Sequence, residues 1–167
     1  IAAELKPGDR VALRDGEGFM LAVLTVSEAW QDGDSWHLGG RVEGASLPPH
    51  PDFASLRATP AELRTLLVRR GWRRVIAWQA HHPMHRAQFE FCLKSAIENE
   101  ANLLLHPQVG ADISDAAGYF GLVRSFLAIR ERFPAATTQL SLLPAPPREA
   151  SARALLLRAI VARNYGC

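Results

Sequence analysis

Three repeats of an apolar run followed by a helical pattern constrain the fold of this chain more than any other feature. The apolar runs cover residues 75–78, 102–106 and 138–143, and the helical patterns that follow them cover residues 84–98, 119–133 and 152–163. Strands that are apolar on both faces and alternate with helices form parallel sheets with helices on each side. The repeats therefore predict an α/β fold with a Rossmann-like, doubly wound parallel sheet.

The expected helices carry signals of their own. Before the first repeat, Thr59 can cap a helix that starts at Pro60, Glu62 completes a capping box, and Gly71 is the expected stop. The apolar residues of the helix at 84–98 recur at helical spacing and are expected to face the sheet: Phe89, Cys92, Leu93, Ala96 and Ile97. The last helix is followed only by residues 164–167, where another strand is expected. We therefore interpret the sheet as incomplete at its C-terminal end.

The first 45 residues have a different pattern, of short strands separated by turns. The turn signals are Asp15-Gly16, Asp32-Gly33 and Gly39-Gly40. The prolines of residues 47–51 then interrupt regular structure, because each proline removes a backbone donor and restricts the residue before it. We predict a small β domain over residues 1–57, with its N-terminal limit left open, and an α/β domain over residues 58–167.

Composition narrows the class of protein. Of the 167 residues, 48% are hydrophobic and 22% are charged, and the formal net charge is +2, which is too weakly basic to predict nucleic-acid binding. No apolar run approaches the ~20 residues needed to span a bilayer, and no export signal is visible. Only two cysteines are present, so no disulfide framework is expected. We expect a cytoplasmic protein with no membrane or nucleic-acid partner.

The loop between the first apolar run and its helix concentrates the polar chemistry of the chain. Residues 79–88 read Gln-Ala-His-His-Pro-Met-His-Arg-Ala-Gln. A loop that leads from a strand into a helix is where α/β proteins bind phosphate, because the first backbone N–H groups and the helix dipole attract anions. A metal site is the alternative, with His81, His82, His85 and His106 as ligands. No cysteine or carboxylate accompanies them at a matching spacing, so we predict no metal.

These ten residues resemble the signature of the ATP sulfurylase (sulfate adenylyltransferase) family, which runs Gln-Thr-Arg-Asn-Pro-x-His-Arg-Ala-His. Further segments resemble family text in family order, at residues 49–53, 59–64, 70–72, 102–107, 109–110, 140–144 and 163–167. The resemblance implies a PUA-like β domain followed by a nucleotidyltransferase domain, and a later Gly-Arg-Asp-His-Ala-Gly motif that this sequence does not contain. It also implies the family's reaction, in which sulfate attacks the α-phosphate of ATP and releases pyrophosphate.

The resemblance assigns site residues by position. In the family, the Gln and Arg of the motif hold sulfate, and its two histidines hold the ATP phosphates. The positions that the resemblance assigns to ATP and sulfate binding are Gln79, His81, His82, His85 and Arg148. It assigns the catalytic role to the positions of the two histidines, which are His85 and Gln88 here. The implied cofactor is ATP with magnesium, and the implied partners are ATP with sulfate or adenylyl sulfate.

Three of these positions depart from the family residues. His81 replaces an arginine, His82 an asparagine and Gln88 the second histidine. An imidazole is mostly neutral at pH 7 whereas arginine is always charged, and a glutamine cannot bring positive charge to a phosphate. Removing one such transition-state contact commonly costs ~3 kcal/mol. We therefore predict a degenerate site with little or no sulfurylase activity.

Three functions are compatible with these patterns, in decreasing order of expectation. The first is a degenerate, structural or regulatory domain of a larger, oligomeric sulfate-activation protein that carries adenylylsulfate kinase, because the family is often fused to that kinase. The second is an active sulfate adenylyltransferase with an altered oxyanion pocket. The third is an RNA-binding module, which only the PUA likeness suggests.

Overall fold

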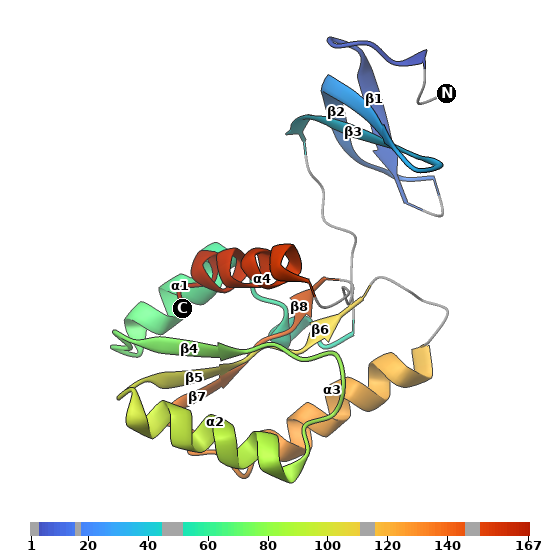
Figure 1. The fold of residues 1–167 in the computed structure, drawn as a ribbon. Helices are drawn as coiled ribbons and strands as arrows, with labels where there is room; N and C mark the ends of the chain where they lie inside the picture. The colour runs from blue at the N-terminus through green and yellow to red at the C-terminus, as the bar shows by residue number, and fades with distance from the viewer. Residues whose placement is uncertain (1–3, 16–17, 45–51, 111–115, 146–150) are drawn as a thin grey trace. The chain divides into compact units, whose positions relative to one another are not determined.

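The computed structural model describes residues 4–15, 18–44, 52–110, 116–145 and 151–167. The chain divides into two compact units, Ile1–Asp52 and Phe53–Cys167 (Figure 1). Within the described residues, no helix is both long enough and apolar enough to cross a membrane.

The first unit is a three-stranded antiparallel sheet in the order β1-β2-β3. Its strands are β1 (Arg10–Arg14), β2 (Met20–Asp32) and β3 (Ser35–Glu43). Gly33 joins β2 to β3 with a φ of 58°, which a residue without a side chain adopts readily, so the predicted Asp32-Gly33 turn is confirmed. Alternate residues of β2 are buried, namely Ala22, Leu24 and Val26, and the sheet therefore has one covered face.

The turn predicted at Gly39-Gly40 is wrong, because both residues lie inside β3. They pair with Glu28 and Val26 across a β-bulge in β2. A Cβ atom on Gly40 would lie 2.0 Å from the Thr25 carbonyl oxygen, so only glycine permits this approach of the two strands. The glycine pair therefore serves close strand packing at a bulge rather than chain reversal.

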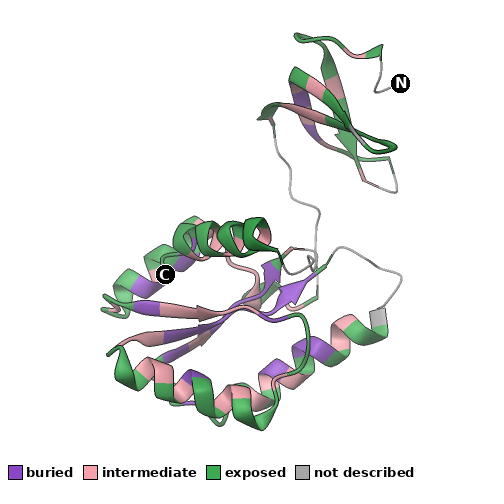
Figure 2. Cartoon of the chain, in the orientation of Figure 1, coloured by how far each residue is buried: buried purple, intermediate pink, exposed green. Residues whose placement is uncertain are grey.

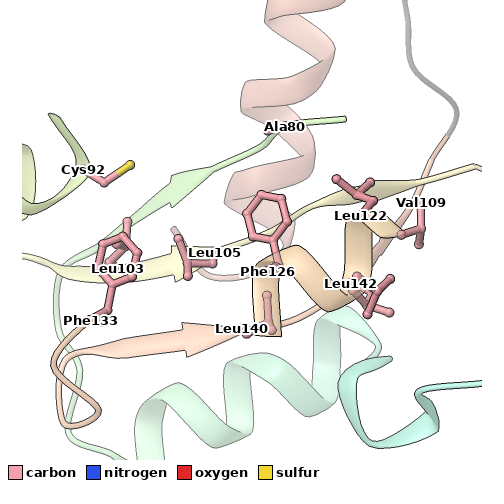
Figure 3. Close-up of a cluster of buried hydrophobic side chains, with 11 residues drawn as sticks. Ala80, Cys92, Leu103, Leu105, Val109, Leu122, Phe126, Phe133, Leu140 and Leu142 are labelled. Carbon is pink, nitrogen blue, oxygen red and sulfur yellow. The ribbon is translucent and has the colours of Figure 1, made fainter. Parts of the chain in front are cut away.

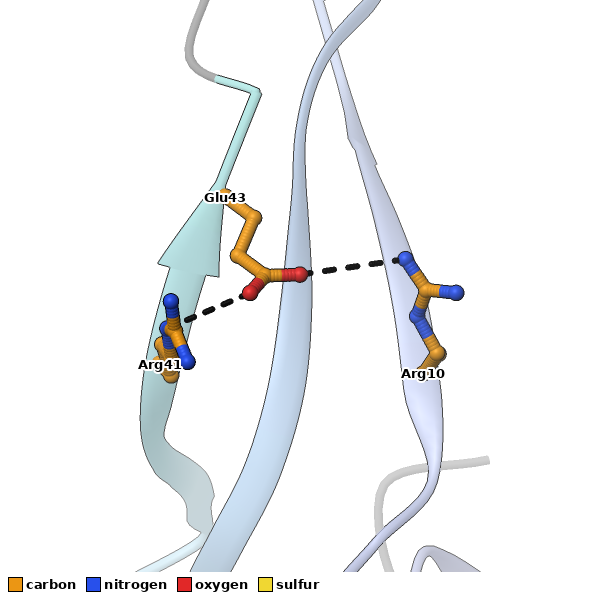
Figure 4. A network of polar contacts seen from close by, with 3 residues as sticks. All are labelled: Arg10, Arg41 and Glu43. Atoms are coloured by element: carbon orange, nitrogen blue, oxygen red, sulfur yellow. Dashed lines mark ion pairs between the residues drawn. The ribbon is translucent and has the colours of Figure 1, made fainter.

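A polar network links the outer strands of this sheet (Figure 4). Glu43 lies 3.2 Å from Arg41 on the same strand and 3.9 Å from Arg10 on β1. All three side chains are exposed to solvent, so each pair contributes at most about 1 kcal/mol. Burial along β2 therefore stabilises the sheet more than these charges do.

The second unit is built on a three-stranded parallel sheet in the order β4-β5-β7. The strands are β4 (Val75–Trp78), β5 (Asn102–Leu105) and β7 (Thr138–Leu140). Trp78 pairs with Leu105, and Leu105 pairs with Leu140, so the carboxyl ends of the strands lie level at one edge. The α/β architecture with a parallel sheet, predicted from the three repeats, is confirmed.

Helices cover both faces of this sheet (Figure 1). They are α1 (Pro60–Arg69), α2 (Arg86–Glu98), α3 (Ala116–Arg130) and α4 (Ala152–Asn164). Successive residues of β5 point to opposite faces, as the strand repeat requires. Leu103 and Leu105 pack in one core cluster with α2 and α3, and Leu104 packs in another with α1 and the end of α4.

The larger core cluster lies between the sheet and α2 and α3 (Figure 3). Its buried members are Ala80, Cys92, Leu103, Leu105, Val109, Leu122, Val123, Phe126, Phe133, Leu140 and Leu142. Figure 2 shows that the buried residues concentrate on the strands and on the inward sides of these helices. Phe126 is fully buried there, and burial of a phenylalanine side chain contributes roughly 1.5–3 kcal/mol.

The strand predicted at 138–143 is divided in two. β7 ends at Leu140, and Leu143–Pro144 form the short strand β8, which pairs with β6 (Gln108–Val109). Between them the chain bonds to the short 3-10 turn Ala54–Leu56, because Leu142 N–H donates to the Leu56 carbonyl at 2.8 Å. A contact with residues far away in sequence thus divides a run that the sequence pattern alone presents as one strand.

One residue of the predicted helix stripe is exposed. Ile97 was expected to face the sheet, but 76% of it is accessible to solvent. It lines an open groove with Leu93, Asn102 and Thr138, at the amino-terminal edge of the sheet. The last turn of α2 lies beside the first residues of β5 and β7, where the core ends, so Ile97 has no core to cover.

The second unit starts at Phe53, within the β domain predicted for residues 1–57. Phe53 packs against Tyr119 and Phe120 of α3, with ring centroids 6.1 Å and 5.8 Å away. Arg57 donates to the Tyr119 hydroxyl at 2.8 Å. These contacts attach the segment before α1 to the α/β unit. The segment 47–51, whose prolines are expected to interrupt regular structure, lies outside the described residues.

The start of α1 forms as the sequence predicts. Thr59 N–H donates to Glu62 Oε2 at 2.8 Å, and Glu62 N–H donates to Thr59 Oγ1 at 3.3 Å, which is a complete capping box. The Thr59 hydroxyl also donates to Glu62 Oε2, at 2.8 Å. The bond from the Thr59 backbone N–H, and to a smaller extent the bond from its hydroxyl, lower the pKa of the Glu62 carboxyl below its usual value.

We expect Thr59→Ala to lower the free energy of unfolding of the second unit by about 1 kcal/mol, because the cap is lost. Urea unfolding followed by circular dichroism at 222 nm measures this. The matched control is Thr65→Ala, at an exposed position inside α1, where alanine is the better helix former. Equal destabilisation by both variants would contradict a capping role.

Candidate functional site

The motif at residues 79–88 lies at the carboxyl ends of β4 and β5, where α/β folds place their ligands. Its loop leads from β4 into α2, which starts at Arg86 rather than at Met84 as predicted. Two backbone bonds tie the corner to the next strand segment. His106 N–H donates to the Trp78 carbonyl at 2.9 Å, and Gln108 N–H donates to the Ala80 carbonyl at 2.7 Å.

His85 and Gln88, at the positions of the family's two histidines, form the cap of α2. His85 is the N-cap residue, and its backbone N–H donates to Gln88 Oε1 at 3.2 Å. This is the arrangement in which the N3 side chain of a capping box reaches back to the N-cap backbone. Gln88 therefore has a structural role that accounts for its presence without a nucleotide, and its amide oxygen adds negative partial charge near the helix start.

His81 and His82 lie next to each other on the loop. Both are exposed, and their rings meet edge to face with centroids 5.3 Å apart. His82 Nδ1 lies 3.1 Å from the Pro83 carbonyl oxygen, so this ring contacts its own loop. Neither side chain presents the planar, permanently charged fork that an arginine offers to an oxyanion.

Gln79 lies apart from these histidines, because its side chain points toward α4. Its amide Nε2 donates to the Arg158 carbonyl at 3.4 Å, near the long limit of a hydrogen bond. The bond joins the end of β4 to the helix that covers it. Of the positions assigned by resemblance, the structure thus brings His85 to Gln88 and His81 to His82, and directs Gln79 to α4.

Two ligand predictions remain, the role of Arg148 and the alternative of a metal site. Arg148 lies outside the described residues. Within the described residues, no group of three or more His, Cys, Asp or Glu side chains could hold a metal ion.

His106, which the sequence offered as a ligand of the alternative metal site, is the most unusual polar group of the region. His106 is fully buried, and neither ring nitrogen has a hydrogen-bond partner within the described chain. Its ring meets that of Tyr165 edge to face at 4.6 Å. Burial lowers the pKa of His106 to about 4, because a charged imidazole would lose its hydration. The sequence signal for this burial was its place at the end of an apolar run, directly before a proline.

The charge of the second unit suits an anionic ligand. Residues 53–167 contain fifteen Lys and Arg residues and eight Asp and Glu residues, whereas residues 1–52 contain four and nine. The field of a basic unit concentrates anions around it. The charge difference between the units was not visible in the small net charge of the whole chain.

The chain is similar to known proteins over nearly its whole length. The ATP-sulfurylase family model matches residues 54–167. A sulfate adenylyltransferase of Aspergillus terreus is 36% identical over 183 residues, which cover 98% of this chain and 32% of the relative. The Schizosaccharomyces pombe sulfate adenylyltransferase is 35% identical over 194 residues, covering 99% of this chain and 39% of the relative.

A solved structure is also similar over nearly the whole chain. It is described as a hexameric APS kinase from Thiobacillus denitrificans, with 80% sequence identity and a TM-score of 0.92, covering 99% of this chain and 34% of that one. The chain therefore spans about a third of the length of the proteins it matches. Since the family model matches most of the chain and the identities extend over nearly all of it, this chain belongs to the ATP sulfurylase family.

Proposed function

We propose that this chain is the sulfate adenylyltransferase-like part of a longer sulfate-activation protein, and that its site has little or no sulfurylase activity. In this proposal the motif keeps weak contacts to ATP, sulfate or adenylyl sulfate, chiefly through Gln79 and the first turn of α2. The domain then serves an architectural or regulatory role beside an adenylylsulfate kinase.

The observation that carries the proposal is the use of motif side chains for local structure. Gln88 accepts from the His85 backbone, and Gln79 donates to α4. The remaining histidines of the loop are exposed. Stabilising the charge of a phosphoryl transition state requires preorganised cationic donors. The described motif offers instead amides and imidazoles, with Arg86 paired to Glu90 at 2.7 Å.

The similar solved structure supports two parts of the proposal, a fused adenylylsulfate kinase and a homo-oligomer. A chain that is 80% identical over 99% of this one is part of a protein described as a hexameric APS kinase. A sulfurylase-like region within such a protein needs no turnover of its own in order to persist as an assembly surface. We therefore include a homo-oligomer, a fused kinase and a cytoplasmic location in the proposal, with ATP and magnesium as the cofactor of the larger protein.

The charge distribution argues against the RNA-binding alternative. Residues 1–52, which would form the PUA-like module, contain nine Asp and Glu residues against four Lys and Arg residues. Nucleic-acid affinity arises largely from cationic side chains that neutralise phosphates. An acidic unit of this kind repels that partner.

The experiment is an assay of the full-length protein that contains this chain. We expect adenylyl sulfate formation from ATP and sulfate to be at the background level, measured as pyrophosphate release. Phosphorylation of added adenylyl sulfate by ATP should proceed in the same preparation, which shows that the protein is folded. Sulfurylase turnover at ordinary rates would instead establish an active enzyme with an altered oxyanion pocket.

A double variant tests the missing charges. His81→Arg with Gln88→His should raise pyrophosphate release at least tenfold, because one restored charged contact is worth about two orders of magnitude in rate. The matched control makes the same substitutions in the first unit, His37→Arg with Gln31→His, and should leave the rate unchanged. An unchanged rate in the motif variant would contradict the view that these charges limit activity.

A further inference from the structure

Two buried polar side chains at the carboxyl end of β5 have no hydrogen-bond partner for their polar atoms in the described structure. They are His106, at both ring nitrogens, and Gln108, at Oε1. His106 is 0% exposed and Gln108 6%. A buried polar atom left unpaired costs about 1–3 kcal/mol, so native structures nearly always supply a partner. The arrangement therefore needs an explanation.

Gln79 is the neighbouring polar side chain across the sheet. Trp78 pairs with Leu105 in the parallel register, and the His106 N–H donates to the Trp78 carbonyl. The next residues of the two strands, Gln79 and His106, are therefore neighbours. Both side chains lie on the face that α4 covers. Gln79 reaches the Arg158 carbonyl in α4, and the His106 ring meets Tyr165 at the C-terminal cap of that helix.

The chemistry of the two groups is complementary. A neutral imidazole carries one N–H donor and one acceptor. The amide of Gln79 uses a hydrogen of Nε2 for the Arg158 carbonyl, which leaves a second hydrogen for a ligand and the oxygen for a donor. If the amide rotated by 180°, its oxygen would replace the nitrogen as the group presented to an anion. Fixing the amide orientation therefore decides whether Gln79 attracts or repels an oxyanion.

We propose that His106 is a positioning residue for Gln79: its ring N–H is linked to the Gln79 amide oxygen through one buried water, so that the amide N–H₂ group faces a tetrahedral oxyanion such as sulfate. The inference rests on the proposed function, in which Gln79 contacts the oxyanion. His106 itself does not touch the ligand. Its place beneath α4 shields the ring from bulk solvent, so that its hydrogen bond is not exchanged for one to bulk water.

The test reads the Gln79 side-chain amide directly, by ¹⁵N–¹H NMR of the 167-residue chain at neutral pH. In the variant His106→Leu, the Gln79 resonance pair should shift. In His106→Gln, which keeps a donor and an acceptor, the pair should return toward its original position. The internal control is Gln139, whose Nε2 donates to the Leu140 carbonyl at 2.8 Å in β7 and whose signals should stay in place in both variants.

Sulfate binding gives the second readout, with sodium sulfate as the probe. The dissociation constant should rise about fivefold to tenfold in His106→Leu, as expected for the loss of one hydrogen bond of about 1 kcal/mol, and change less than twofold in His106→Gln. If the unaltered chain does not bind sulfate, the oxyanion contact in the proposed function fails. The Gln79 amide resonances recorded without sulfate still test the role of His106.

A measurement on the unaltered chain guards against variants that do not fold. A slowly exchanging His106 ring proton with a nuclear Overhauser contact to the Gln79 amide, or to a bound water that shares it, supports the proposal. A ring proton with no such contact overturns it. An unmoved Gln79 pair in a folded His106→Leu chain also overturns it, because His106 would then serve packing alone.

Discussion

Truncation of Phe126 to alanine is expected to lower the free energy of unfolding of the second unit by about 3–5 kcal/mol. Phe126 is 0% exposed in the middle of α3 and belongs to the cluster with Leu105 and Leu140 (Figure 3). Removing its ring takes away buried apolar surface and leaves a cavity that strands on one side and a helix on the other cannot close. An effect of this size is a large part of the stability of an ordinary domain.

The matched control is the same substitution on the surface. Phe91 on α2 is 60% exposed, and its ring lies 6.2 Å from that of Trp78, so Phe91→Ala should cost about 1 kcal/mol or less. All four described α-helices belong to the second unit, and urea unfolding followed at 222 nm therefore reports this unit. Similar losses in the two variants would show that α3 is not the centre of the core.

The parallel sheet could be predicted because its determinants are local. The apolar strand at 75–78 and the capping box at Thr59 act through neighbours in sequence, and both formed as expected. Ile97 and the pair Gly39-Gly40 could not be placed this way. Whether Ile97 is covered depends on where β5 begins, and the role of Gly40 depends on the Thr25 carbonyl across the sheet.

The candidate site was predictable in position more than in contacts. The order of strand, loop and helix located the motif at the carboxyl edge of the sheet, as elementary α/β topology requires. Gln88 accepts a hydrogen bond from the His85 N–H three residues before it. This spacing is that of a capping box, so the contact could have been predicted from the sequence. The partner of Gln79 is a carbonyl of α4, 79 residues further along the chain, and no local pattern reveals such a bond.

His106 is expected to make the second unit sensitive to acid below about pH 6.5. Burial lowers the pKa of His106 to about 4 in the folded chain, against about 6.5 in an unfolded one. Above pH 6.5 the ring is neutral in both states and adds no pH dependence. As the pH falls from 6.5 toward 4, the unfolded chain binds a proton that the folded chain does not, so the free energy of unfolding decreases.

The size of this loss follows from the two pKa values of His106. At pH 4.5 it is about 2.5 kcal/mol, from proton linkage at 1.36 kcal/mol per pKa unit. The measurement is the urea unfolding free energy of the unaltered chain and of His106→Phe, whose ring can still meet Tyr165, between pH 7.5 and 4.5. Carboxylates titrate in both proteins and cancel in the difference, so the unaltered chain should lose about 2.5 kcal/mol relative to the variant. Parallel pH profiles would mean that the His106 ring accepts a proton without unfolding, which requires an anionic or accepting partner for its second nitrogen in the folded state.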